Sequence, residues 1–369
     1  MPRDPFALVT QVPGFAAIVR KKPRLVASVV RHQALRRLAR RRGGTVLTSM
    51  EYAVSYACDA RCGHCSSAGL TEGRREKERL GAAELRALAG KARKMGVYEV
   101  NLTGGEPTLR RDLEEIVGCF APDRTFIGLN THGRHLDERR VRGLASAGVD
   151  LLKLSLDSDV PEDHDRNRAL PGAWHHVVWL LELVRSVSGL RAHVCAVGTP
   201  EMIRGGGARR LVELADRHDA TIGFTLPAAV GRWGGRYEVQ LEARDLASLQ
   251  EICRHPRAFF QGSLGTGDFA CPAGREEIYV TPWGDVLPCP FVQRSFGNVR
   301  VDALPILQER IGEAVAQAGG RSLCLAADAQ RWMKSHLPDA GARLDLPTCA
   351  AEHKDGFCHA PVDPNRGEA

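Results

Sequence analysis

Apolar and polar positions alternate along the first two thirds of the chain in blocks that predict strands followed by helices. The strand-like blocks are short runs rich in β-branched and aromatic residues, and they end in polar or glycine-containing turns. The blocks between them carry apolar residues at helical spacing. The pattern predicts strands near residues 46–56, 98–103, 126–133, 151–157, 191–197 and 221–226, and helices near 82–95, 111–119, 137–147, 173–186 and 207–219.

Regular alternation of strands and helices indicates an α/β fold with a parallel sheet. Ligands of such sheets bind at the carboxyl ends of the strands, so the residues that follow each strand are the first candidates for a site. A chain of 369 residues is too long for one small domain and suits a barrel with an appendage. We therefore expect a basic amphipathic helical segment at 1–44, a barrel at 45–240 and a smaller extension at 241–369.

Composition narrows the class of protein. Hydrophobic residues make up 43% of the chain, which is enough for a buried core, and no run of 18 apolar residues predicts a membrane span. The apolar stretch at 6–19 contains Pro13 and is followed, not preceded, by basic residues, which is the wrong polarity for a signal peptide. Eleven cysteines without a secretory signal indicate a reducing compartment and thiolates that bind metal. We expect a soluble, cytoplasmic protein.

Three of these cysteines, Cys58, Cys62 and Cys65, lie in one short loop after the first predicted strand. Four thiolates would close a zinc site or saturate a four-iron cluster, whereas three at these spacings can hold three irons and leave the fourth open. Zinc sites usually show two Cys-x2-Cys pairs, so the spacing favours iron over zinc and over a chance cluster of buried cysteines. An open iron is a position for chemistry.

The second predicted strand runs into a Gly-Gly-Glu-Pro turn at 104–107. Together with the Cys-x3-Cys-x2-Cys loop, this turn resembles the radical S-adenosylmethionine (SAM) superfamily, in which the two motifs lie at the ends of the first two barrel strands. The resemblance implies a partial (β/α)6 TIM-like barrel, a [4Fe-4S] cluster and SAM. It also implies that SAM's amino and carboxylate groups chelate the open iron, and that an electron cleaves SAM to a 5′-deoxyadenosyl radical that abstracts hydrogen from the substrate.

The same resemblance implies roles for residues around SAM. Gly104 and Gly105 have no Cβ, which would let the backbone approach the methionyl ammonium, and Glu106 would bring a charge near it. His64 stands where the family usually carries an aromatic residue that touches the adenine. The alternative for His64 is a solvent-facing loop histidine.

Two later strand ends extend the likeness. The segment that begins at Asn130 resembles the family's Asn-Thr-Asn-Gly, with His132 in the third place, and this departure leaves His132 without an implied role. Ser155 and Asp157 are two residues apart and leave the fourth strand on one face, where similar enzymes meet the ribose or methionine carboxylate of SAM. Residues 164–168 resemble the family's His-Asp-x-x-Arg loop, with a solvated charged loop as the equal alternative.

A second cysteine pattern follows the barrel. Cys271 and Cys289 flank a predicted hairpin, which resembles the opening of the SPASM or twitch extension and implies an auxiliary iron–sulfur cluster. The family's later dense cysteine run is missing, and the remaining single cysteines suffice for one auxiliary [4Fe-4S] cluster. We expect Cys324 as its third ligand, with Cys349 or Cys358 completing it. The alternative is a hairpin stiffened by buried cysteines.

The amino terminus is the most basic part of the chain. Ten Lys or Arg residues and no acid lie between Arg20 and Arg42, among apolar residues at helical spacing. The whole chain carries only +7, so the basicity is local. Such a helix can coat the bottom of the barrel, contact a membrane surface through residues 18–42, or grip an acidic partner. It lacks the interleaved aromatics of a nucleic-acid platform, and we expect no nucleic acid as partner.

These features predict a radical SAM oxidoreductase or related radical-based modifying enzyme, supplied with electrons by a donor such as flavodoxin or ferredoxin. We expect a small metabolite of the sugar or aminocyclitol type as substrate, with the auxiliary cluster taking the substrate electron. Peptide maturation is the alternative, although the roughly 45 residues before the first strand hardly supply a leader-binding winged helix. A membrane-associated enzyme acting on a lipid or lipid-linked substrate is another. A non-catalytic iron–sulfur or zinc protein is disfavoured by the joint presence of both SAM-site motifs.

Overall fold

The structure is a computed structural model, and it describes residues 15–41, 43–68, 70, 78–260, 271–317, 324, 326 and 327. Two of the candidate cluster ligands, Cys349 and Cys358, lie outside these residues. None of the nine cysteines within them forms a disulfide.

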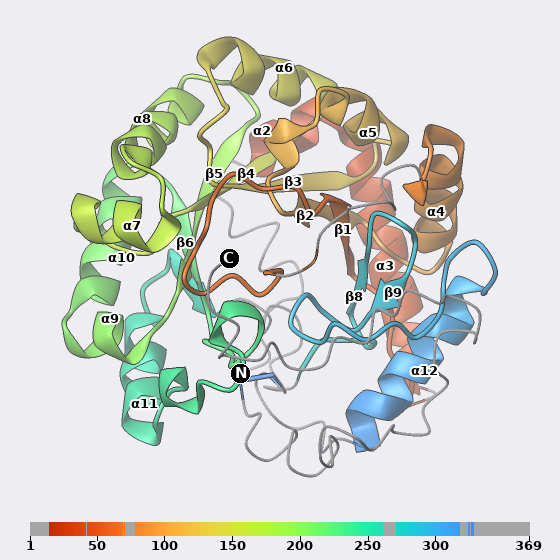
Figure 1. The fold of residues 1–369 in the computed structure, drawn as a ribbon. Coiled ribbons are helices and arrows are strands. Elements are labelled where there is room, and N and C mark those ends of the chain that lie inside the picture. Colours follow the sequence, from red (N-terminus) through yellow and green to blue (C-terminus); the bar gives the residue numbers. More distant parts are fainter. Residues whose placement is uncertain are drawn as a thin grey trace.

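The described residues build one nine-stranded sheet that curves around the centre of the molecule (Figure 1). The order β7-β6-β5-β4-β3-β2-β1-β8-β9 keeps β1 to β7 in chain sequence, and every neighbouring pair is parallel except β8 with β9. The sheet is not closed, which confirms the α/β partial barrel. Its strands are β1 Ser49–Ser55, β2 Glu99–Gly104, β3 Phe126–Thr131, β4 Leu151–Ser155, β5 Arg191–Val197, β6 Thr221–Thr225, β7 Ala258–Phe260, β8 Glu277–Val280 and β9 Val286–Leu287.

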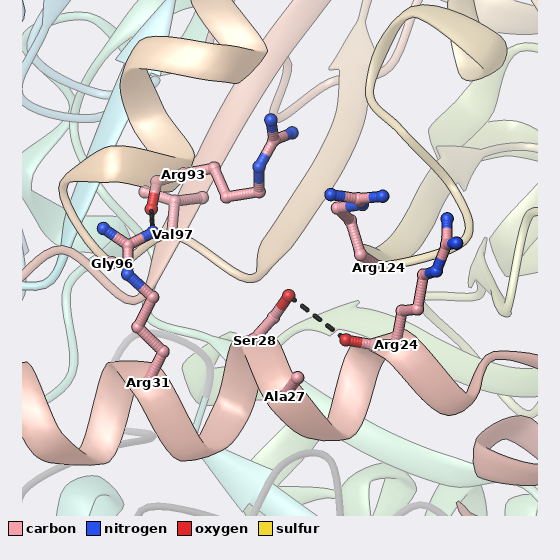
Figure 2. A pocket seen from close by; sticks show the side chains of 8 residues that line it. All are labelled: Arg24, Ala27, Ser28, Arg31, Arg93, Gly96, Val97 and Arg124. Atoms are coloured by element: carbon pink, nitrogen blue, oxygen red, sulfur yellow. Dashed lines mark hydrogen bonds between the residues drawn. The ribbon is translucent and has the colours of Figure 1, made fainter.

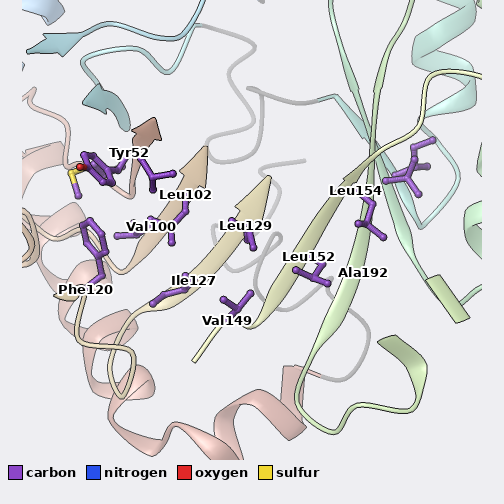
Figure 3. Packing of buried hydrophobic residues seen from close by; sticks show 14 of the residues in the cluster. Tyr52, Val100, Leu102, Phe120, Ile127, Leu129, Val149, Leu152, Leu154 and Ala192 are labelled. Carbon is purple, nitrogen blue, oxygen red and sulfur yellow. The ribbon is translucent and has the colours of Figure 1, made fainter. Parts of the chain in front are cut away.

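Helices cover the outer face of this sheet, because alternate strand residues turn an apolar side outward. Val100 and Leu102 of β2 join the main apolar cluster with Leu129 of β3 (Figure 3), whereas Glu99 and Asn101 of β2 point to the inner face. The inner face is therefore polar. The helices are α4 Ala82–Lys94, α5 Leu113–Cys119, α6 Glu138–Ala147, α7 Pro161–Arg168, α8 Ala173–Arg185, α9 Pro200–Arg204, α10 Gly207–Arg217 and α11 Ala243–Ile252.

The predicted carboxyl-terminal hairpin is confirmed as β8 and β9, but it is part of the barrel sheet. Strand β8 pairs in parallel with β1, so a segment more than 200 residues away in the chain extends the sheet at its first strand. Helix α12, Leu304–Gln317, follows and packs Leu307 and Ile311 into the main core. At the other edge β7 pairs with β6, so the sheet continues past the predicted boundary at residue 240.

The basic amino-terminal segment forms α2, Phe15–Lys21, and α3, Pro23–Arg41, which cover the amino ends of the strands. The His32 ring lies edge-on to Tyr98 at 5.0 Å between centroids, and its Nδ1 is 3.0 Å from the Gly96 carbonyl oxygen. Leu25 and Val29 pack in one cluster with Phe126 and Leu151. Among the alternatives for this segment, the structure thus supports the helix that coats the bottom of the barrel.

A buried ion pair anchors these helices. The Lys22 ammonium contacts the Asp150 carboxylate and donates to the carbonyl oxygens of Thr125 and Gly148 at 3.1 and 2.7 Å. The Asp150 carboxylate also accepts from the Ile127 amide at 2.9 Å. Burial lowers the pKa of Lys22 and raises the pKa of Asp150 to about 6, and each partner offsets part of that effect in the other. Both side chains therefore depend on remaining paired.

We expect Asp150→Ala to lower the free energy of unfolding by about 3–5 kcal/mol, because it leaves the Lys22 charge buried and unpaired. Urea unfolding would measure this, with Asp123→Ala as the matched control. Asp123 pairs with Arg24 at the surface, so its loss should cost at most about 1 kcal/mol. Adding Lys22→Met to Asp150→Ala should recover part of the loss, and a double variant as unstable as the sum of the singles would contradict the pairing.

Candidate functional site

The three-cysteine loop leaves the carboxyl end of β1 and brings its thiols together. Cys62 is buried, Cys65 is half-buried and Cys58 is exposed. Burial raises the pKa of Cys58 to about 12 and raises the pKa of Cys65, and the neighbouring Cys62 adds to both effects. Thiols grouped in this way become thiolates when a positive group binds among them, as metal ligands do. The donor set fits three ligands of an iron–sulfur cluster.

The Gly-Gly turn packs directly against the backbone that enters this loop. A Cβ on Gly104 would lie 2.0 Å from the Ser55 carbonyl oxygen, and one on Gly105 would lie 2.3 Å from that of Ala57. Gly104 also has φ +127°, which side chains rarely adopt. The Gly105 amide donates to Ser55 at 2.7 Å. The structure thus shows one reason for the two glycines, the close approach of the protein backbone. Their contact with SAM stays a prediction.

Glu106 joins this turn to the end of β3. Its side chain is fully buried, and its carboxylate accepts from the Thr108 amide at 3.0 Å, the Thr131 hydroxyl at 2.6 Å and the His132 amide at 2.9 Å. We expected this charge to lie near the SAM ammonium. In the structure, protein donors contact the carboxylate, so Glu106 connects two neighbouring strand ends. Its place near the SAM ammonium stays a prediction.

Asp157 and Arg168 hold the loop from the other side. Arg168 donates to Asp157 at 2.6 Å and reaches the Cys62 sulfur at 3.7 Å. Burial alone would raise the pKa of Asp157, but the Arg168 guanidinium outweighs burial and holds that pKa well below its usual range. Asp157 is therefore an ion-pair partner that positions a cation beside the Cys62 thiol, and its contact with SAM stays a prediction. Residues 164–168 belong to α7, which decides against the solvated-loop alternative.

His64 lies in a packed position rather than in solvent. Its ring lies 5.7 Å from the Trp233 ring between centroids, and its Nδ1 accepts from the Asn167 side-chain amide at 3.1 Å. Burial lowers the pKa of His64, so the ring is neutral near pH 7. The short 3-10 helix Gly231–Trp233 is held by the Arg232 amide, which donates to the Cys65 carbonyl at 3.0 Å. This contact was not predicted from the sequence.

Two histidines contact Asp59 in the cysteine loop, and this contact was not predicted from the sequence. Asp59, next to Cys58, accepts from His132 Nε2 and His135 Nε2, each at 3.0 Å. His132 Nδ1 accepts from the Arg134 amide at 3.2 Å, so Nε2 is the nitrogen that carries the proton. The histidine that departs from the family's asparagine thus has a partner inside the cysteine loop, and the pair ties the loop to the end of β3.

Asn130 and Ser155 line the inner side of the same strand ends. The Asn130 side-chain oxygen is buried and has no hydrogen-bond partner within the described part of the chain. Ser155 is the last residue of β4. An unpaired buried acceptor needs a donor, and the ammonium or hydroxyl groups of SAM would supply one. The residues present therefore fit a cluster and SAM at the carboxyl ends of β1 to β4.

Below this point the inner face is acidic. Glu51 of β1, Glu99 of β2 and Glu277 of β8 act on one another, with Lys153 of β4 as a neighbouring cation. Burial, and then Glu51, raise the pKa of Glu277 to about 8. The side-chain oxygen of Asn101, which is almost fully buried, has no hydrogen-bond partner among the described residues. This face therefore gathers three carboxyl groups and a buried amide oxygen around Lys153.

The second cysteine pattern also comes together. Burial, followed by its neighbours Cys271 and Cys324, raises the pKa of Cys289 well above its usual value. Cys271 lies before β8, Cys289 after β9 and Cys324 beyond α12. The sheet extension therefore brings together thiols that are up to 53 residues apart in the sequence. The grouping includes Cys324, whose place the sequence left least constrained. It fits three ligands of a second cluster.

Comparison with known proteins agrees with these motifs. The family model described as "Radical SAM superfamily" matches residues 52–201. The chain is 32% identical over 259 residues to "PqqA peptide cyclase" of Streptomyces rochei, covering 64% of this chain and 67% of that protein. It is 27% identical over 270 residues to "Mycofactocin maturase MftC" of Mycobacterium ulcerans (strain Agy99), covering 69% and 72%.

Among solved structures, "Streptococcus suis SuiB bound to precursor peptide SuiA" has a similar fold. Its TM-score is 0.57 at 16% identity, and the match covers 75% of this chain and 67% of that one. The likeness extends beyond the barrel strands because it covers three quarters of the chain.

We expect Asp59→Ala to loosen the cysteine loop, because it removes the acceptor of both histidines. Loss of a partner that orients a metal ligand typically costs about 10–100-fold in metal affinity. Iron should therefore pass to a chelator roughly tenfold faster than from the unaltered protein, under anaerobic conditions. The matched control is His135→Ala, which keeps the buried His132 contact and should change the rate less. Equal rates of iron transfer from Asp59→Ala and from the unaltered protein would show that the contact of Asp59 with the two histidines does not hold the loop.

Proposed function

Because the chain belongs to the radical SAM superfamily, we propose that it is a peptide-modifying enzyme whose Cys58, Cys62 and Cys65 bind the [4Fe-4S] cluster. When bound, the cluster and SAM supply a carbon radical that abstracts a hydrogen atom. The observation that carries the proposal is the convergence of the three thiols with Arg168 and the unpaired Asn130 oxygen at one end of the sheet. Similarity to relatives named as a peptide cyclase and a maturase supports the peptide.

This proposal corrects the substrate that we expected first. The sugar or aminocyclitol interpretation was based on the short segment before the first strand. Within residues 15–41 and 43–48 the structure describes two helices and no strand, so these residues do not include a winged helix. The relatives' names nevertheless favour a peptide over a small metabolite. We therefore adopt the peptide alternative.

The inner face of the sheet suits a peptide. Its carboxyl groups accept hydrogen bonds, as does the Asn101 oxygen, which has no partner among the described residues, and a peptide brings backbone N–H donors. Side chains on this face come from β1, β2, β4 and β8, so the face is continuous beneath the strand ends that carry the cysteine loop. A peptide lying there would be close to the proposed SAM position.

In this proposal each part of the site has a separate task. His64, Gly104, Gly105, Asn130 and Ser155 shape the SAM position, and Glu106 and Asp157 hold the loops that form it. Cys271, Cys289 and Cys324 bind an auxiliary cluster that takes the electron left on the substrate. A protein such as flavodoxin or ferredoxin supplies the first electron.

We expect Cys62→Ala to lose about four irons per chain and all formation of 5′-deoxyadenosine, because it removes a ligand of the radical-generating cluster. Iron, sulfide and 5′-deoxyadenosine would be measured after anaerobic reconstitution and reduction. The matched control is Cys119→Ala, a buried cysteine of α5 outside both groups. It should keep about eight irons, the content of two four-iron clusters. Retained cleavage of SAM in Cys62→Ala would refute the assignment.

We expect Cys289→Ala to behave differently, because the proposed auxiliary cluster does not bind SAM. The variant should lose about four irons yet continue to form 5′-deoxyadenosine in the absence of substrate. The same iron and nucleoside assays measure both quantities. If its iron content equals that of the unaltered protein, the second cysteine group is structural.

The substrate class is tested by isotope transfer. Hydrogen abstraction moves deuterium from a deuterated substrate to 5′-deoxyadenosine, which mass spectrometry detects. The enzyme would be incubated separately with the small-peptide fraction and the sugar-containing fraction of cells of the source organism grown in deuterated medium. Deuterium from the peptide fraction is expected. Deuterium transfer from the sugar fraction alone would contradict a peptide substrate and support a small metabolite as the substrate.

A further inference from the structure

Helix α3 has two apolar sides, although a surface helix normally turns one toward the core. Leu25 and Val29 face the barrel and are buried. Val26, Val30 and Leu38 remain 42%, 60% and 48% exposed. At 100° per residue these three point away from the packed side, and the exposed Ala27 and Ala34 lie among them. We call this set, Val26, Ala27, Val30, Ala34 and Leu38, the outer stripe.

At 100° per residue, Arg37 and Arg41 lie on the same side of the helix as the outer stripe, and no acid lies between them. No Asp or Glu occurs in α2 or α3. Arg37 and Arg41 form no ion pair with any residue that the structure describes, in contrast to Lys22 with its partner Asp150. Arg40 lies close enough to Glu276 to offset part of the rise that burial causes in the pKa of that carboxyl. A helix face that carries apolar side chains and unpaired cations but no acid can rest on an anionic membrane surface.

A hollow of about 280 Å³ opens beside the stripe, between α3 and the barrel (Figure 2). Arg24 and Arg31 line it from α3, and Arg93 and Arg124 line it from the barrel. Arg24 and Arg124 share one carboxylate, that of Asp123, and each lies 3.1 Å from it.

The other two arginines of this hollow have no acidic partner in the described residues. Arg31 donates to the carbonyl oxygens of Arg93 and Lys94 at 2.9 and 3.1 Å. The Arg93 guanidinium itself forms no ion pair there. Four guanidinium groups line the hollow, and among the described residues only the Asp123 carboxylate pairs with any of them. The hollow is therefore net positive, which suits a compact anion such as a phosphate group.

We propose that α3 docks this protein on an anionic phospholipid bilayer. The outer stripe enters the apolar part of the interface, the long side chains of Arg37 and Arg41 reach from the same face to the lipid phosphates, and the hollow accepts one headgroup. An acidic peptide would neutralise the arginines but leave the outer stripe in water, so the two observations together favour the bilayer. No helix among the described residues is long and apolar enough to span a membrane, so this contact is peripheral.

The position of α3 makes docking compatible with catalysis. The helix covers the amino ends of the strands, whereas the cysteine loop leaves their carboxyl ends (Figure 1). The docked face and the candidate site are therefore at opposite ends of the sheet. The proposal is independent of the substrate, because it depends only on α3 and its neighbours.

The test is co-sedimentation of the full-length protein with vesicles. Vesicles of phosphatidylcholine mixed with phosphatidylglycerol should bind it, vesicles of phosphatidylcholine alone should bind it at least tenfold more weakly, and added salt should weaken binding. Val30→Glu puts a charge into the outer stripe and should reduce binding about tenfold. Arg37→Gln combined with Arg41→Gln should reduce it by a similar factor.

The matched control is Val301→Glu, because Val301 is 83% exposed and lies outside α3. It should bind like the unaltered protein, and formation of 5′-deoxyadenosine should be unchanged in Val30→Glu and Val301→Glu, which shows that both variants fold. Polyglutamate and inorganic phosphate serve as competing probes. No binding to anionic vesicles would overturn the proposal. So would Val30→Glu binding as well as Val301→Glu, because charge alone would then account for the affinity and an acidic partner would be favoured.

Discussion

The close approach of two backbones at the carboxyl ends of β1 and β2 is the contact on which the rest of the site depends. Gly104 and Gly105 lie against the carbonyl oxygens of Ser55 and Ala57, at a separation that excludes any Cβ. Amide hydrogen bonds from Gly105 and Glu106 to the same two carbonyls fix the direction in which the chain leaves β1. The cysteine loop begins at the next residue, so the geometry of its three thiols depends on this contact.

Buried charges then hold the loop from its two sides. Glu106 joins the ends of β2 and β3, and the Asp157–Arg168 pair reaches Cys62 from β4 and α7. Burying such groups is costly, and each has the hydrogen bonds that offset the cost. The Asp59–His132 hydrogen bond adds a further contact, which connects the cysteine loop itself to the end of β3. A loop supported in this way is preorganised, which keeps its thiols grouped before any cluster binds.

The two ends of the sheet differ in character because their coverings differ. Strand ends with glycines, carboxylates and cysteines form the carboxyl end, where parallel α/β sheets bind ligands. Helices α2 and α3 cover the amino end and are anchored by Lys22, so the basic charge of the chain is concentrated far from the cysteine loop. Substitutions in α3 and substitutions around the cysteine loop can therefore be made independently of each other.

The local pattern determined β1 to β6 and the two cysteine groups, because side-chain alternation and motif spacing are properties of neighbouring residues. Only the tertiary structure decided that β8 extends the sheet beside β1, since a four-residue strand does not encode its partner. It also decided that Cys324 meets Cys289 and that Asp59 meets His132. Glu106 and Asp157 stood in the expected places, yet their protein partners come from other strands and from α7. Sequence specifies which side a residue faces, whereas the register of distant strands determines what it meets there.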